Sequence, residues 1–77
     1  MGGTKQPEDL QQIIAGNIRR SRKRLKMSQE RLGEACGYHR TYIGLVERSR
    51  VNMSVSAVEA IAKALGVDPS ELLKPPA

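Results

Sequence analysis

The sequence lacks many of the residues on which large or specialised proteins depend. Its 77 residues include no Trp or Phe and only two Tyr, so a hydrophobic core has to be built from Leu, Ile, Val and Met. Cys36 is the single cysteine, which excludes an internal disulfide and suits a reducing compartment. No apolar run approaches the roughly 20 residues that span a bilayer, and no signal peptide is recognisable. We therefore expect one small domain without a membrane segment.

Positive charge is plentiful and unevenly placed. The net charge is +5, but residues 19–50 carry ten Lys or Arg against three acids, a local balance of +7. A basic middle with near-neutral flanks is typical of a surface for polyanions, most often nucleic acid and less often anionic lipid. The basic run "RRSRKRLK" can equally be a solvated helix face that adds only long-range attraction.

The apolar residues follow a helical period throughout, and no segment alternates like a strand. The pattern predicts an all-α domain of five helices: residues 7–26, a helix from the cap Ser28 to Gly37, residues 39–48, a helix from the cap Ser54 to Gly66, and a short one after Asp68. Residues 1–6 are expected to be a flexible tail, residues 7–74 the domain, and residues 75–77 a second tail. The positions expected to face inward are Leu10, Ile14, Ile18, Leu25, Leu32, Ala35, Cys36, Ile43, Val46, Val55, Val58, Ile61, Ala62 and Leu65.

Two charged residues also point inward by this period. Arg22 lies on the apolar stripe of the first helix, and Glu47 follows Ile43 by four residues. An unpaired buried charge is very costly, so the two are expected to pair. The alternative is that one of them extends to the rim of the core.

Residues 28–48 have the spacing of a helix-turn-helix, in which the second helix enters the DNA major groove. Leu32 is expected to be buried, Gly33 to lie where the two helices cross closely, and Gly37 to make the turn. Ile43 and Val46 are expected to anchor the reading helix from behind.

The runs "MSQERLGEACG", "YIGLVERS" and "AIAKALGVDPSELL" resemble the Cro/CI-like (XRE) family of bacterial and phage regulators. Within it, "HRTYIGLVER" followed by "VNMSV" looks most like the controller proteins of restriction–modification systems. The resemblance implies a lambda-repressor-like fold, a buried pair of Arg22 with Glu47, and dimers that bind operators upstream of the controller and endonuclease genes. Gly33 replaces the usual alanine, which on helix propensity alone loosens this helix by up to about 1 kcal/mol.

Candidate DNA contacts follow from positions on and around the reading helix. Base contacts are expected from Arg40, whose fork matches guanine O6 and N7, and from Thr41 and Leu45. For each there is an alternative: a phosphate contact for Arg40, a helix cap for Thr41, cover of apolar surface for Leu45. Backbone contacts are expected from Gln29, His39, Tyr42, Arg48, Arg50 and Asn52. His39 can instead cap the helix, Tyr42 can belong to the core, and Asn52 can stabilise its loop.

One reading helix covers too few base pairs for a genome, so a homodimer on a palindromic operator is expected. Aliphatic residues beyond the needs of a minimal core suggest its interface: Leu65, Val67, Leu72 and Leu73. The sequence shows no catalytic constellation, metal-ligand spacing or phosphate-binding glycine loop, so neither enzyme activity, a cofactor, nor a small-molecule ligand is expected. The expected partner is double-stranded DNA, in the cytoplasm on the nucleoid. Rival hypotheses are a phage-type repressor, an antitoxin, and a basic amphipathic module for membranes or partner helices.

Overall fold

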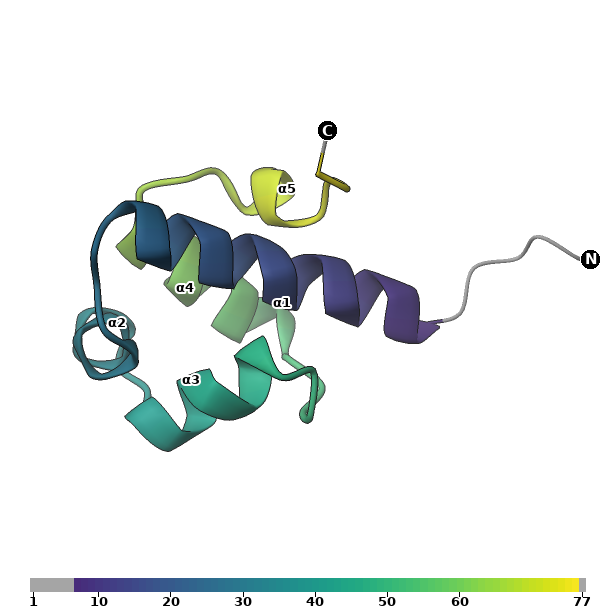
Figure 1. Cartoon of the computed structure of the whole chain (residues 1–77). Coiled ribbons are helices and arrows are strands. Elements are labelled where there is room, and N and C mark those ends of the chain that lie inside the picture. The colour runs from purple at the N-terminus through teal and green to yellow at the C-terminus, as the bar shows by residue number, and fades with distance from the viewer. Residues whose placement is uncertain (1–6, 77) are drawn as a thin grey trace, which may run out of the picture.

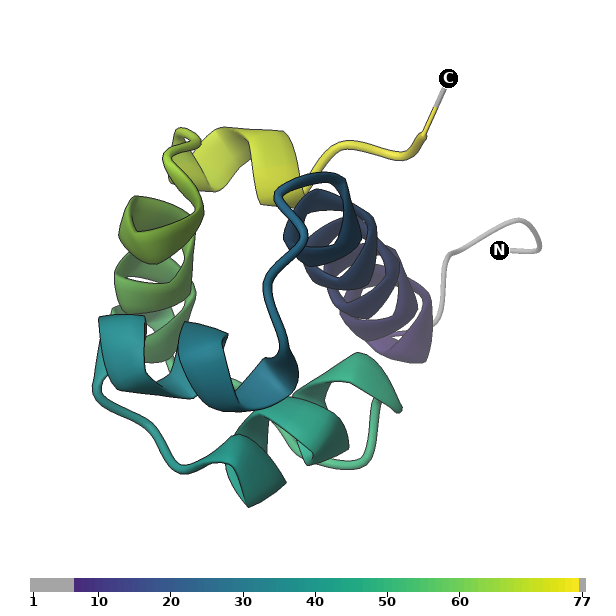
Figure 2. The ribbon, with the colours of Figure 1, turned by 60° about the vertical axis from the view of Figure 1, so that its left-hand side comes forward.

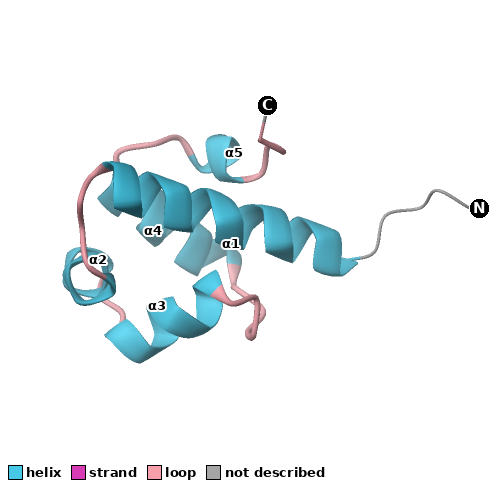
Figure 3. Cartoon of the chain, viewed as in Figure 1, coloured by secondary structure: helices cyan, strands magenta, loops and turns pink. Residues whose placement is uncertain are grey.

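The computed structural model describes residues 7–76, with side chains from residue 10 onward. The expected N-terminal tail and Ala77 lie outside these residues. All regular structure in residues 7–76 is helical (Figure 3), with the helices α1 Pro7–Arg24, α2 Gln29–Cys36, α3 Arg40–Glu47, α4 Val55–Leu65 and α5 Pro69–Leu72. The predicted all-α fold with five helices is therefore confirmed.

The helices are arranged around the centre of the domain (Figure 2), and their inward side chains form one aliphatic core. Helix α1 packs against α3 and α4, α2 packs against α3 and α4, and α5 lies across the end formed by α1 and α4. Figure 1 shows α5 on one side of α1 and α3 on the other. The buried core consists of Ile14, Ile18, Leu32, Ile43, Val46, Ile61, Ala62, Leu65 and Leu72. The middle of the apolar stripe of α1, at Ile14 and Ile18, is thus inside the domain and is not available to a membrane or a partner helix.

The helix starts use the predicted caps. Ser28 Oγ accepts a hydrogen bond from the Arg31 N–H at 2.9 Å, and Ser54 Oγ accepts one from the Ala57 N–H at 3.0 Å. These bonds satisfy N–H groups that the first turn of a helix leaves free. The left-handed backbone of Gly37, at φ 86°, ends α2 as expected.

The cap residue Asp68 holds the first turn of α5. Asp68 Oδ1 accepts from the Ser70 N–H at 2.9 Å and from the Ser70 hydroxyl at 2.7 Å, and these bonds hold the pKa of Asp68 below its usual value. The Glu71 carboxylate pairs with Lys74 Nζ at 3.1 Å instead of turning back to the cap. Glu71 is placed to form a reciprocal capping box with Asp68, in which its side chain would accept from the Asp68 N–H, but its carboxylate bonds to Lys74.

Four residues expected to face inward are exposed, each for a local reason. Leu10 is 46% exposed because the first turns of α1 extend past the other helices (Figure 1). Leu25 is 48% exposed because α1 ends at Arg24 rather than Lys26. Val55 is 75% exposed in the first turn of α4, before the core begins. Ala35 lies on the outer side of α2.

Leu65 and Leu72 are not surplus to the core. Both are buried, with 5% and 1% of their surface exposed, so the expectation that they are left over for a dimer interface is wrong. Asn17 of α1 holds the end of α5 against α1: its Nδ2 donates to the carbonyl oxygens of Leu72 and Lys74, each at 2.8 Å. The described chain is too short to leave these leucines outside its own core. Val67 is half-buried and Leu73 is 43% exposed.

Candidate nucleic-acid interface

The turn between α2 and α3 brings two backbone segments unusually close. A Cβ atom on Gly33 would lie 2.3 Å from the Tyr38 carbonyl oxygen and 3.3 Å from the Arg40 nitrogen. The Gly33 carbonyl also accepts from the N–H groups of Gly37 and Tyr38, at 2.8 and 3.0 Å. The expected close crossing is present. Helix propensity alone does not describe this position, because the absence of a side chain on Gly33 makes the close contact possible.

His39 begins α3 as its cap. Its Nδ1 accepts a hydrogen bond from the Thr41 N–H at 3.0 Å, and its carbonyl accepts from the Tyr42 and Ile43 N–H groups. Acceptance at Nδ1 requires that this nitrogen carry no proton, which leaves the ring proton on Nε2. The capping alternative for His39 is therefore correct, and its exposed ring remains beside the first turn of α3.

An ion pair holds α3 against α1. Arg22 Nε donates to Glu47 Oε2 at 2.6 Å and Nη2 donates to Oε1 at 3.0 Å, so the expected pair is formed with two parallel bonds. Arg22 Nη1 also donates to the Met27 carbonyl at 2.7 Å. The hydrogen bonds from Arg22 to Glu47 raise the pKa of Arg22, against the opposing effect of burial.

Gln29 completes this network from the first residue of α2. Its Nε2 donates to Glu47 Oε1 at 3.1 Å, and its side-chain oxygen lies over Gly44. Gly44 of α3 is buried beneath this side chain. One carboxylate thus connects α1, α2 and α3, and this network sets the angle at which α3 is presented.

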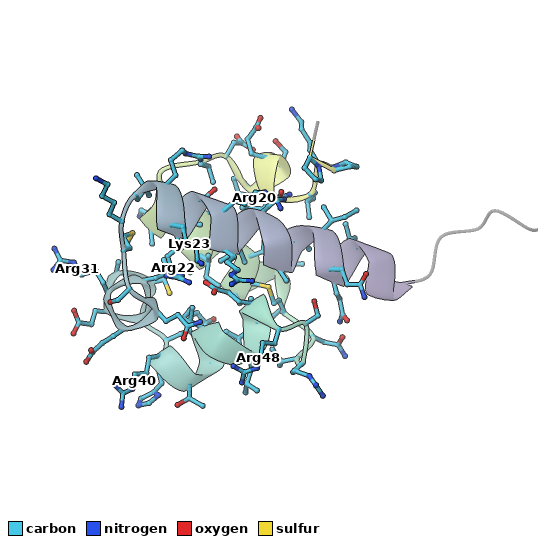
Figure 4. The ribbon with its side chains drawn as sticks, in the orientation of Figure 1. Arg20, Arg22, Lys23, Arg31, Arg40 and Arg48 are labelled. Carbon is cyan, nitrogen blue, oxygen red and sulfur yellow. The ribbon has the colours of Figure 1, made fainter. Side chains whose placement is uncertain are left out.

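The outer side of α3 carries the expected base-reading residues. Arg40 and Thr41 are exposed in the first turn, and Leu45 is half-buried one turn later. Figure 4 shows Arg40 and Arg48 projecting from the two ends of α3 on the side away from α5. These residues lie on one continuous surface, but their contacts with DNA remain predictions.

Two of the expected backbone contacts have structural partners as well. Tyr42 stacks on Tyr38 with ring centroids 4.7 Å apart, and burial raises the pKa of its hydroxyl. Asn52 Oδ1 accepts a hydrogen bond from Gln11 Nε2, which attaches the loop before α4 to α1. Arg48 and Arg50 are exposed in the segment that follows α3.

Comparison with known proteins agrees with this geometry. A family model described as a helix-turn-helix domain matches residues 13–73. The chain belongs to this helix-turn-helix family. Control protein C.SmaI of Serratia marcescens is 45% identical over 65 residues, which cover 84% of this chain and 77% of that protein. A hypothetical transcription factor of Neisseria meningitidis is 45% identical over 69 residues, covering 90% of this chain and 65% of the relative.

Solved helix-turn-helix structures superimpose on most of the chain. The restriction–modification controller protein C.AhdI of Aeromonas hydrophila matches with a TM-score of 0.78 and 34% identity, covering 80% of this chain and 94% of that one. The P22 c2 repressor, solved in complex with a synthetic operator, matches with a TM-score of 0.75 and 35% identity, covering 82% and 96%. The resemblance to Cro/CI-like regulators and to controller proteins inferred from the sequence is confirmed.

Sequence reasoning missed two residues of this helix-turn-helix surface, Arg19 and Lys23. Both line a hollow of about 360 Å³ between α1 and the α2–α3 unit, together with Gln29 and Arg48. Their spacing of four residues, on the same side of α1 as the inward-facing Arg22, is the signal that could have identified them.

Proposed function

We propose that this protein is a sequence-specific DNA-binding transcription regulator. The observation that carries the proposal is the presentation of α3. Its back is anchored by Ile43 and Val46, its end by Glu47, and its first turn exposes Arg40 and Thr41. A rigidly held short helix with a polar, basic outer face suits insertion into the major groove.

The proposed role is that of a restriction–modification controller. Support comes from the similarity to C.SmaI and C.AhdI, which their names describe as controllers. The chain spans 65% of the length of the Neisseria relative. The controller activity of the whole protein is therefore part of this proposal. The proposal also places the protein on the nucleoid in the cytoplasm, where a regulator of this kind would bind DNA. No helix within residues 7–76 is long and apolar enough to cross a membrane.

The proposed contacts divide into two classes. Base contacts are assigned to Arg40, Thr41 and Leu45, with Arg40 bound to a guanine through two hydrogen bonds. Contacts to the sugar–phosphate backbone are assigned to the surrounding polar residues: Gln29, His39, Tyr42, Arg48, Arg50 and Asn52.

A homodimer on a palindromic operator completes the proposal. Two α3 helices related by two-fold symmetry would read half-sites about 10 base pairs apart. Because Leu65 and Leu72 are in the core, the proposed interface depends on Val67 and Leu73, which retain exposed surface near α5.

Selection of bound duplexes from a random pool tests the whole proposal. We expect enrichment of one two-fold symmetric sequence, with a guanine in each half-site, because a symmetric dimer reads the same bases twice. Recovery of sequences without a common motif, at an affinity that depends only on salt, would show a non-specific binder and contradict the proposed function.

A further inference from the structure

The hollow between α1 and α3 combines free positive charges with a neutral floor. Of the ion pairs in residues 10–76, one joins Arg22 to Glu47 and the other joins Glu71 to Lys74. Arg19, Lys23 and Arg48, which line the hollow, are exposed and take part in neither. Four basic residues and one acid line it, a balance of +3. The hollow therefore attracts an anion.

The buried network beneath these cations keeps Glu47 from repelling such an anion. Only 3% of the Glu47 side chain is exposed, and its two oxygens accept hydrogen bonds from Arg22 and Gln29. Arg22 is in turn occupied by Glu47 and Met27, so it supports the floor and is not a free cation. The charge that an incoming group meets comes from the side chains at the rim.

The place of the hollow relative to α3 indicates which anion it takes. Arg48 follows the last residue of α3, and Arg40 is the first, so an eight-residue helix of about 12 Å separates them. The DNA major groove is also about 12 Å wide. When the first turn of α3 meets base edges, the opposite end of the helix and the neighbouring side of α1 come to the phosphate ridge that borders the groove.

We propose that Arg19, Lys23 and Arg48 form a seat for one phosphodiester of the DNA backbone, with Gln29 at its edge. This inference rests on the proposed DNA-binding function and adds α1 to the contact surface. The seat fixes the orientation of α3 because the same hollow contains the Arg22–Glu47 pair that holds α3 to α1. Phosphate binding here adds affinity for every sequence and carries no sequence information.

The basic run of α1 supplies its own matched control. Arg20 and Arg24 have the same four-residue spacing as Arg19 and Lys23, but they line a different hollow, beside α5. Figure 4 places Arg20 on the α5 side of α1, whereas Arg48 lies on the far side of the molecule. Two double variants, Arg19→Gln with Lys23→Gln and Arg20→Gln with Arg24→Gln, remove the same charge from the same helix on different faces.

Binding of both double variants is measured on the selected operator and on a scrambled duplex, across a salt series. For Arg19→Gln with Lys23→Gln we expect a loss on the order of tenfold on both duplexes near 0.15 M salt. The slope of log affinity against log salt should fall by about 0.9 per bound subunit, the value for one phosphate, and so by about 1.8 for the dimer. The Arg20→Gln, Arg24→Gln variant should lose less than about twofold with an unchanged slope, because it alters only long-range attraction. Melting temperatures of both double variants equal to that of the native protein would show that the variants are folded.

Ethylation of single phosphates locates the contact on the DNA. Ethylation of one phosphate in each half-site should weaken DNA binding by the native protein. The same ethylation should have no further effect on binding by the Arg19→Gln, Lys23→Gln variant. Equal losses for the two double variants, or no phosphate with this behaviour, would overturn the seat. If the native protein binds DNA without any sequence preference, the proposed function as a sequence-specific regulator is wrong. The comparison of the two double variants on the scrambled duplex still decides whether the phosphate seat exists.

Discussion

Arg22 and Arg40 are the same residue type in opposite surroundings. Three of the five N–H groups of the Arg22 guanidinium donate hydrogen bonds, two to Glu47 and one to the Met27 carbonyl. Arg40 is exposed in the first turn of α3, where none of the hydrogen bonds of the described residues uses its side chain. Arg22 therefore contributes to the fold, and Arg40 is available to DNA.

Replacement of Arg40 tests direct base reading. Arg40→Ala should cost about 1–3 kcal/mol of binding free energy per half-site and remove the preference for guanine at that base pair. Folding should be unaffected, because the side chain is exposed. The measurement compares affinity for operator and non-specific DNA over a salt series. An equal loss on both, with the salt slope reduced by about one per half-site, would make Arg40 a phosphate contact and leave base reading to Thr41 and Leu45.

Lys26 adopts a left-handed backbone, at φ 59°, in the turn after α1. Its N–H donates to the Lys23 carbonyl and the Met27 N–H donates to the Arg22 carbonyl, an arrangement that commonly uses glycine. Lys26→Gly should raise the free energy of unfolding by about 0.5–1 kcal/mol, because relief of the steric cost exceeds the added entropy of the unfolded chain. Lys26→Ala removes the same charge but keeps a Cβ, so urea denaturation should show no such gain for it.

At the scale of the elements, α2 and α3 are joined by a contact between backbones. Gly33→Ala would place a Cβ 2.3 Å from the Tyr38 carbonyl oxygen, so one of the helices has to shift. We expect a loss of about 1–3 kcal/mol in thermal unfolding, where helix propensity alone predicts a gain. Gly16→Ala on α1 is the control: its Cβ would meet only the end of the Arg20 side chain, at 3.3 Å, and it should stabilise. Stabilisation by both substitutions would contradict the close contact.

The attachment of α3 to α1 depends on the buried ion pair. Glu47→Ala strands the Arg22 guanidinium in a site where 11% of its side chain is exposed, and should cost about 3–5 kcal/mol. Glu34→Ala removes the same charge from the exposed side of α2 and should cost little. Melting temperatures of the two variants decide the matter: small and equal decreases would mean that the pair contributes nothing to stability.

At the scale of the whole molecule, the proposed dimer depends on surface that the single chain leaves exposed. Leu73→Asp should weaken self-association without unfolding the protein, because the side chain is 43% exposed just after α5. Leu72→Asp, one residue earlier, should unfold it, because that side chain is 1% exposed. Sedimentation measures the first effect and thermal unfolding the second. A native protein that stays monomeric at micromolar concentration and on operator DNA would exclude the dimer.

Local features of the fold could be predicted from the sequence alone. Ser28 and Ser54 as caps, and Gly37 and Gly66 as helix ends, each depend on bonds within about five residues along the chain. The inward pair of charges was also visible, because a helical period places a residue on a face wherever the neighbouring helices lie. The existence and order of the helices, and the exposure of Arg40 and Thr41 on α3, therefore followed from the sequence.

The tertiary structure decided which partner each face meets. The basic run contains two interleaved pairs with the same four-residue spacing, yet Arg19 and Lys23 lie beside α3 while Arg20 and Arg24 lie beside α5. Likewise Leu72 is buried and Leu73 exposed because Asn17 draws the end of α5 onto α1 from 55 residues away in the chain. A period in the sequence specifies that a side is apolar or charged, but the contacts of that side depend on the packing of segments distant along the chain.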